Sequence, residues 1–120
     1  MKKILTPIVC SFFASLVIGQ NKETISAKPD SAKKIEIVEA ACGQCQLGLA
    51  GKNCDLAVRI NGKSYYVDGT SIDAHGDAHA KDGFCNSIRK AEVQGEVVNN
   101  RFKATYFKLL KPAVPEKKDQ

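Results

Sequence analysis

The sequence has little of what large enzymes require. Its 120 residues include no tryptophan, and only 7% of them are aromatic. A chain of this length forms at most one domain, which excludes a Rossmann or TIM-barrel enzyme. The chain also lacks a Gly-x-Ser-x-Gly motif, a phosphate-binding loop and a His-Glu-x-x-His motif. We therefore expect a protein that is not an enzyme, with weak thiol–disulfide exchange as the one activity left open.

Clustered positive charge is also missing from the central part of the chain. The formal net charge is +5, but residues 35–110 carry nine basic and nine acidic side chains. The excess of lysine lies on either side of this range. Because a nucleic-acid-binding surface needs clustered Lys and Arg, we expect no nucleic-acid partner.

The only long hydrophobic run lies at the N-terminus. Lys2 and Lys3 precede an apolar stretch from Ile4 to Ile18, and polar residues follow from Gln20. This pattern is typical of a secretory signal peptide, and the run is shorter than the roughly 20 residues of a membrane-spanning helix. We predict a signal peptide over residues 1–19. The mature protein is then exported, either periplasmic or secreted, and makes no contact with the membrane.

Two polar segments flank the predicted domain. Residues 20–34 and 111–120 contain Lys, Ser and Pro without apolar periodicity, which is typical of linkers and tails. We predict a polar linker over residues 20–34, a folded domain over residues 35–110 and a disordered tail over residues 111–120.

Two asparagine turns predict the strand pairing. Asn61-Gly62 lies between alternating apolar runs and predicts a type I′ hairpin, because both turn positions need positive φ. This turn pairs Val58 with Tyr65. Folding about Asn99-Asn100 predicts a second hairpin. Its register pairs Val97 with Phe102, Gly95 with Ala104 and Val93 with Tyr106, and the mid-strand Gly95 predicts a bulge.

The remaining elements complete a fold prediction. Alternation from Ile35 to Ala40 predicts a first strand, and the glycine-rich residues after Cys42 predict a loop. Ala, Lys and Arg between the hairpins favour a short helix over residues 86–90, with a further turn over residues 75–80. We therefore predict a mainly β protein, a small five-stranded OB-like barrel with one short helix between the third and fourth strands. An open β-sandwich or meander is the alternative.

Four cysteines remain after removal of the signal peptide, which contains Cys10. They are Cys42, Cys45, Cys54 and Cys85. An even number of cysteines in an exported chain predicts two disulfides, with three possible pairings. The absence of His after the Cys-x-x-Cys excludes covalent c-type haem attachment.

The same cysteines also predict a metal site. The Cys42-Gly-Gln-Cys45 spacing lets two thiolates reach one ion. His75 and His79 lie four residues apart, so a helix there would present both imidazoles on one face. A site built from Cys42, Cys45, Cys54, Cys85, His75 and His79 suits zinc or copper. Asp55 and Asp68 lie opposite each other in the predicted hairpin, which is unfavourable unless a cation lies between them.

Three segments are distinctive in combination: Cys-Gly-x-Cys, Cys-Asp-Leu-Ala-Val-Arg-Ile and His-Gly-Asp-Ala-His, followed by a fourth Cys. Over residues 37–110 the chain resembles a family of short exported bacterial proteins of unknown function. The resemblance implies a fold and a shared Cys/His site, but no activity.

These observations lead to two functional hypotheses. The first is an exported small binding module whose Cys/His cluster binds a metal ion or an exported protein partner. The alternative is a disulfide-stabilised structural or protein-interaction domain, without metal or catalysis. In that case Arg59, Tyr66 and Phe107 on the outer face would meet the partner.

Overall fold

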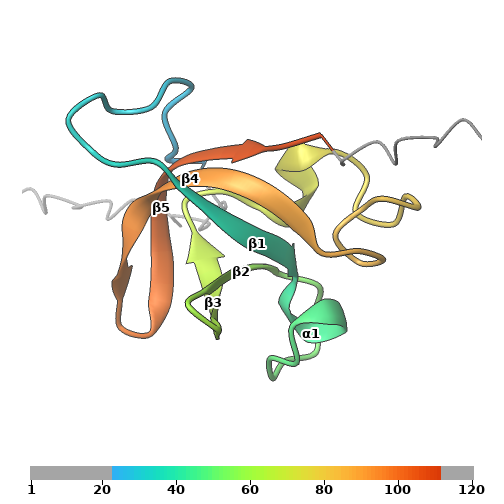
Figure 1. Ribbon diagram of the computed structural model, residues 1–120. Coiled ribbons are helices and arrows are strands. Elements are labelled where there is room, and N and C mark those ends of the chain that lie inside the picture. Colours follow the sequence, from blue (N-terminus) through green and yellow to red (C-terminus); the bar gives the residue numbers. More distant parts are fainter. Residues whose placement is uncertain (1–22, 112–120) are drawn as a thin grey trace, which may run out of the picture.

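The computed structural model describes residues 23–111, which form a closed five-stranded β-barrel (Figure 1). The strands are β1 (Glu36–Cys42), β2 (Leu56–Ile60), β3 (Lys63–Asp68), β4 (Arg89–Val98) and β5 (Arg101–Leu109). Around the barrel their order is β1-β2-β3-β5-β4. The β3–β5 pair is parallel and the other four pairs are antiparallel. Barrel closure confirms the predicted fold class over the open alternatives.

The predicted segments at the two ends of the chain fall largely outside the described residues. The predicted signal peptide, residues 20–22 of the predicted linker and residues 112–120 of the predicted tail lie outside the described residues. Within residues 23–111, no helix has the length and apolar character needed to cross a membrane.

The β2–β3 hairpin has the predicted register. Asn61 and Gly62 have φ values of 49° and 80°, as a type I′ turn requires. Val58 pairs with Tyr65 across the hairpin. Val58 is fully buried in the core, so its side of the hairpin faces the interior of the barrel.

The β4–β5 hairpin follows the predicted register only as far as Gly95. Val97 pairs with Phe102 and Gly95 with Ala104, but Gln94 then pairs with Tyr106, so Thr105 is left as the extra residue of a bulge. One extra residue reverses the inward and outward alternation of a strand. The predicted pairing of Val93 with Tyr106 is therefore wrong.

The bulge brings Phe107 into the core. Phe107 pairs with Val93 and belongs to the same buried cluster, so the prediction that it lies on the outer face is also wrong. Gly95 lies beside the bulge at a φ of 156°, and a Cβ there would overlap the carbonyl oxygen of Lys103. Glycine is thus required at the point where β4 curves.

Two short helical turns connect the strands. The 3₁₀ turn η1 (Ile72–His75) lies between β3 and β4, roughly where a helix was predicted. The other predicted helix, over residues 86–90, is wrong, because Arg89 and Lys90 begin β4 and pair with Ala40 and Glu39 of β1. Conversely, part of the predicted loop after β1 forms the single-turn helix α1 (Gly43–Gln46).

The linker residues before β1 contact the barrel. The backbone N–H of Thr24 donates to Gly69 O at 2.8 Å, and that of Ser26 donates to Thr105 O at 2.8 Å. Gln94, only 3% exposed, accepts from Asp30 N and donates to the carbonyls of Asp30 and Lys33. Residues 23–34 thus lie along the barrel without forming a strand.

Candidate metal centre

Four cysteine side chains converge at one end of the barrel. The Sγ atoms of Cys42, Cys45, Cys54 and Cys85 all lie within 4.8 Å of one another. Cys42 ends β1, Cys45 lies in α1, Cys54 precedes β2 and Cys85 precedes β4. Figure 1 shows α1 beside the end of β1. The four thiols come from the β1–α1 junction, the loop before β2 and the loop before β4. Within residues 23–111 all four are free thiols.

Cys54 has the central position in this cluster. Its Sγ lies 2.7 Å from Cys42 Sγ and 2.7 Å from Cys85 Sγ. The backbone N–H of Cys45 donates to Cys42 Sγ at 3.4 Å, a contact that caps α1. The Cys-x-x-Cys segment therefore forms a turn in which the second cysteine's backbone N–H donates to the sulfur of the first.

Backbone hydrogen bonds fix the segment of Cys85 against that of Cys42. Cys42 N–H donates to Phe84 O at 2.9 Å, and Cys85 N–H donates to Ala78 O at 2.9 Å. In addition, the Gln46 side chain donates to Cys85 O at 2.8 Å. The bonds from Cys42 and Gln46 join residues about 40 positions apart, so they hold together two thiols that are distant in the sequence.

The segment of Cys54 is tied to α1 by a second set of bonds. Gln44 donates from Nε2 to Asp55 Oδ2 at 2.8 Å and accepts from Asp55 N at 2.9 Å. Gly43 N–H donates to Asp55 O at 2.8 Å. Cys54, the residue before Asp55, is therefore held close to the Cys-x-x-Cys turn.

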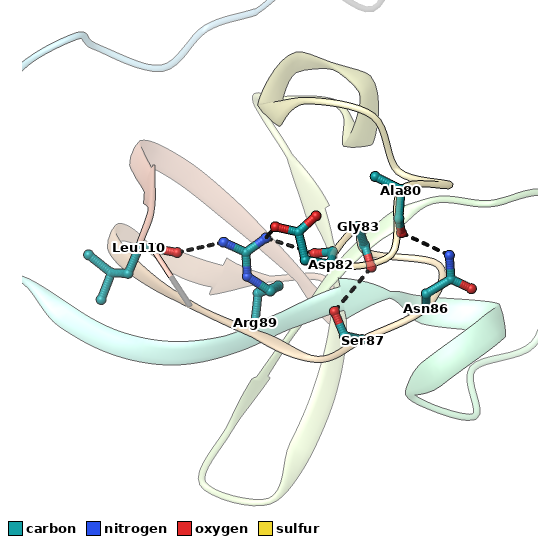
Figure 2. A network of polar contacts seen from close by, with 7 residues as sticks. All are labelled: Ala80, Asp82, Gly83, Asn86, Ser87, Arg89 and Leu110. Atoms are coloured by element: carbon teal, nitrogen blue, oxygen red, sulfur yellow. Dashed lines mark hydrogen bonds and ion pairs between the residues drawn. The ribbon is translucent and has the colours of Figure 1, made fainter. Parts of the chain in front are cut away.

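The loop that carries Cys85 has a polar network of its own (Figure 2). Arg89 donates to the carbonyl oxygens of Asp82 at 2.7 Å and Leu110 at 2.8 Å, and its side chain is only 11% exposed. Asn86 donates to Ala80 O at 2.9 Å, and Ser87 donates to Gly83 O at 3.3 Å. These bonds fold residues 80–87 into a series of turns that fixes the position of Cys85.

The thiols differ in their pKa values. Burial raises the pKa of Cys54 strongly, and hydrogen bonds to Cys42 and Cys85 raise it further. Burial also raises the pKa of Cys42, but hydrogen bonds from Cys54 and Cys45 outweigh that effect, so its net pKa is lowered. The pKa values of these two thiols are thus shifted in opposite directions, and thiolates are the form that binds metals.

The two histidines lie outside the cysteine cluster. His75 Nε2 is 2.8 Å from Thr70 Oγ1, and its ring packs on Phe107 with centroids 4.5 Å apart. His79 is exposed, and its backbone N–H bonds to the Asp77 carboxylate. In the described part of the chain, the group that could hold a metal ion consists of the four cysteines. The structure thus brings together the cysteines of the predicted ligand set and leaves out His75 and His79.

A cation does lie beside the two opposed aspartates. Arg101, at the start of β5, donates to both carboxylate oxygens of Asp68 at 2.9 to 3.0 Å. This hydrogen bond raises the pKa of Arg101, and the charges of Asp68 and Asp55 also raise it. The parallel β3–β5 pairing brings Arg101 there, so the hairpin pattern alone could not identify this cation.

Comparison with known proteins places the chain in one family. Residues 36–110 match a family described as "Family of unknown function (DUF6370)". The chain belongs to this family. No curated protein and no solved structure matches the chain. Membership confirms the resemblance to an uncharacterised family and supplies no activity, so the functional argument rests on the cysteine cluster.

In this DUF6370 member, contacts within the chain already engage the three residues that the alternative hypothesis assigned to a partner surface. Phe107 is buried, and Arg59 forms an ion pair with Glu39 at 2.8 Å. Tyr66 packs against the Cys-x-x-Cys turn, since a Cβ at Gly43 would lie 2.6 Å from its ring. Gln44, Gln46 and Tyr66 therefore support the cysteine cluster, and nothing in their spacing along the sequence indicated this role.

Proposed function

We propose that this protein is an exported metal-binding module in which Cys42, Cys45, Cys54 and Cys85 hold one ion. The observation that carries the proposal is the approach of all four sulfurs to within 4.8 Å of one another. A single ion needs all four ligands at one point, whereas two disulfides need only two separate pairwise contacts. Convergence of four thiols therefore supports a metal over a purely structural disulfide framework.

The dimensions of the cluster suit a tetrahedral tetrathiolate. Zn–S bonds of about 2.3 Å place the sulfurs of a tetrahedron about 3.8 Å apart. The shortest separations are 2.7 Å, and every pair lies within 4.8 Å. An ion would therefore need only small side-chain adjustments that spread Cys54 away from Cys42 and Cys85.

The donor set favours zinc, with copper(I) as the second choice. Four thiolates in a closed tetrahedral arrangement are typical of zinc. Copper(I) also prefers soft sulfur ligands. Calcium and magnesium are excluded as preferred ions because they bind oxygen ligands.

The first experiment measures metal content and thiol state in the same sample. Mature protein is purified from the exported fraction without added chelator, and its metals are quantified. A second aliquot is alkylated under denaturing conditions with chelator but without reductant, and its intact mass is determined. We expect one ion per chain and four added alkyl groups.

Other outcomes have distinct meanings. No alkylation and no bound metal would establish two disulfides and overturn the proposal in favour of the structural or protein-interaction alternative. A fifth alkyl group would identify unprocessed chain, because Cys10 lies in the predicted signal peptide. As a matched control, the His79→Ala variant should retain its metal, since His79 lies outside the cysteine cluster.

A further inference from the structure

The four thiols differ in their access to solvent. Cys42 is fully buried, Cys54 and Cys85 are partly buried, and Cys45 is exposed. The centre is therefore closed on the side of the barrel and open on the side of α1. This asymmetry determines from which side another ligand can reach a bound ion.

The backbone also restrains the four positions unequally. Cys42 lies within the β1–β2 pairing, opposite Leu56, and its N–H is bonded to Phe84 O. Cys85 is held through both its N–H and its carbonyl oxygen. Cys45 lies on a four-residue helical turn of which only Gly43 is buried. Exposure of the Cys45 side chain, on a turn that is otherwise anchored through Gly43 and Gln46, thus distinguishes this ligand from the other three.

We infer that Cys45 is the exchangeable ligand through which the metal is transferred to or from a thiol-bearing partner. This inference rests on the metal site proposed above. An incoming thiolate forms a new bond to the ion from the exposed side, and the bond between the ion and Cys45 breaks. Cys42, Cys54 and Cys85 keep the ion during this step, and full transfer then repeats the same replacement of one thiolate by another at each of them.

The chemistry of this exchange balances without an oxidant or reductant. The incoming thiol loses its proton to solvent as its sulfur binds the ion, and the displaced Cys45 thiolate takes up a proton from solvent. The charge of the ion does not change. The partner is therefore defined by its chemistry as a thiolate donor.

The test uses the full mature chain loaded with cobalt(II) and takes dithiothreitol as the competing dithiol. The thiolate-to-cobalt charge-transfer absorption reports the number of sulfur ligands. With wild-type protein, the rate of metal loss should rise linearly with dithiothreitol concentration, because the dithiol enters the coordination sphere. A rate independent of dithiothreitol would mean that the ion leaves before the dithiol binds, and would overturn the inference.

Two variants separate the exchangeable ligand from a fixed one. Cys45→Ala should retain one cobalt per chain, with water as the fourth ligand, a weaker thiolate band and an affinity reduced by only about tenfold. Cys85→Ala, a matched change at a partly buried thiol, should reduce the affinity by about a hundredfold or more. Cys85 is held through both its N–H and its carbonyl oxygen, and water replaces it less readily than it replaces the exposed Cys45.

The outcomes distinguish this inference from the proposed function. Equal losses of affinity in Cys45→Ala and Cys85→Ala would overturn the exchange role of Cys45 while leaving the metal site intact. Absence of cobalt and zinc binding by the reduced wild-type protein would overturn both. Circular dichroism of the metal-free variants confirms that each loss reflects a missing ligand in a folded chain.

Discussion

The ring of Tyr66 in β3 lies directly against the backbone of Gly43, the residue that follows Cys42. A Cβ added at Gly43 would lie 2.6 Å from Tyr66 Cε1 and 3.1 Å from the Ala57 side chain. The glycine of Cys-Gly-Gln-Cys therefore allows α1 to pack on the barrel. Tyr66 thus sets the position of the turn that supplies two of the four thiols.

Replacing Gly43 by alanine should destabilise the protein. Overpacking at a tight contact costs about 1–3 kcal/mol, and the displaced turn should also weaken metal binding. Urea unfolding of the metal-free protein measures the first effect. The cost should be smaller in a Tyr66→Ala background, where the ring is absent. An equal cost in both backgrounds would contradict the assigned contact.

Removing the positive charge of Arg101 should destabilise the fold modestly. Arg101 and Asp68 are 47% and 40% exposed, so solvent screening limits the effect of Arg101→Gln to about 1 kcal/mol. Adding Asp68→Asn should restore part of the loss, because Asp55 then lacks a like-charged neighbour. The free energy of unfolding at low and high salt measures both effects. Lys81→Gln, at an exposed loop position, is the control for the change in net charge.

The partly buried imidazole of His75 should make stability dependent on pH. Burial lowers the pKa of His75, so the unfolded chain binds a proton at higher pH than the folded one. The stabilisation is therefore fully present above the unfolded pKa of about 6.5 and is lost as pH falls through the lower folded pKa. Urea midpoints of the metal-free protein between pH 8 and 5 measure this loss.

Two substitutions test the assignment of that dependence. His75→Gln should flatten the slope of stability against pH. His79→Gln, at an exposed imidazole, should leave the slope unchanged. If the slope survives the first change, a group other than His75 is responsible for it.

Replacing Gln94 by glutamate should release the segment before β1. Gln94 donates through Nε2 to the carbonyls of Asp30 and Lys33 at 2.8 and 2.9 Å, and a carboxylate cannot donate these bonds. A buried charge facing two carbonyl oxygens is also unfavourable. We expect a loss of about 1–3 kcal/mol and faster amide exchange at Asp30, whereas the exposed change Glu96→Gln should have little effect.

Several elements could be predicted because their signals are local. Asn61-Gly62 and Asn99-Asn100 specify turns through the backbone conformations that they tolerate, and each turn fixes the register of the strands beside it. The spacing of Cys42 and Cys45 likewise places two thiols in one turn. Short-range backbone geometry is sufficient for these features. The sequence by itself therefore determined the β2–β3 hairpin, the β4–β5 hairpin as far as Gly95 and the first half of the cysteine cluster.

Long-range contacts decided the rest. The paired-histidine prediction required a helix through His75 and His79, but η1 ends at His75 and Gly76 follows at a φ of 105°, so no helix spans the two residues. The extra residue Thr105 moved Phe107 into the core. Closure of the barrel placed Arg101 beside Asp68, and packing of Phe84 on the end of β1 brought Cys85 to Cys54. These outcomes depend on which distant segments pack together, and no local pattern specifies that choice.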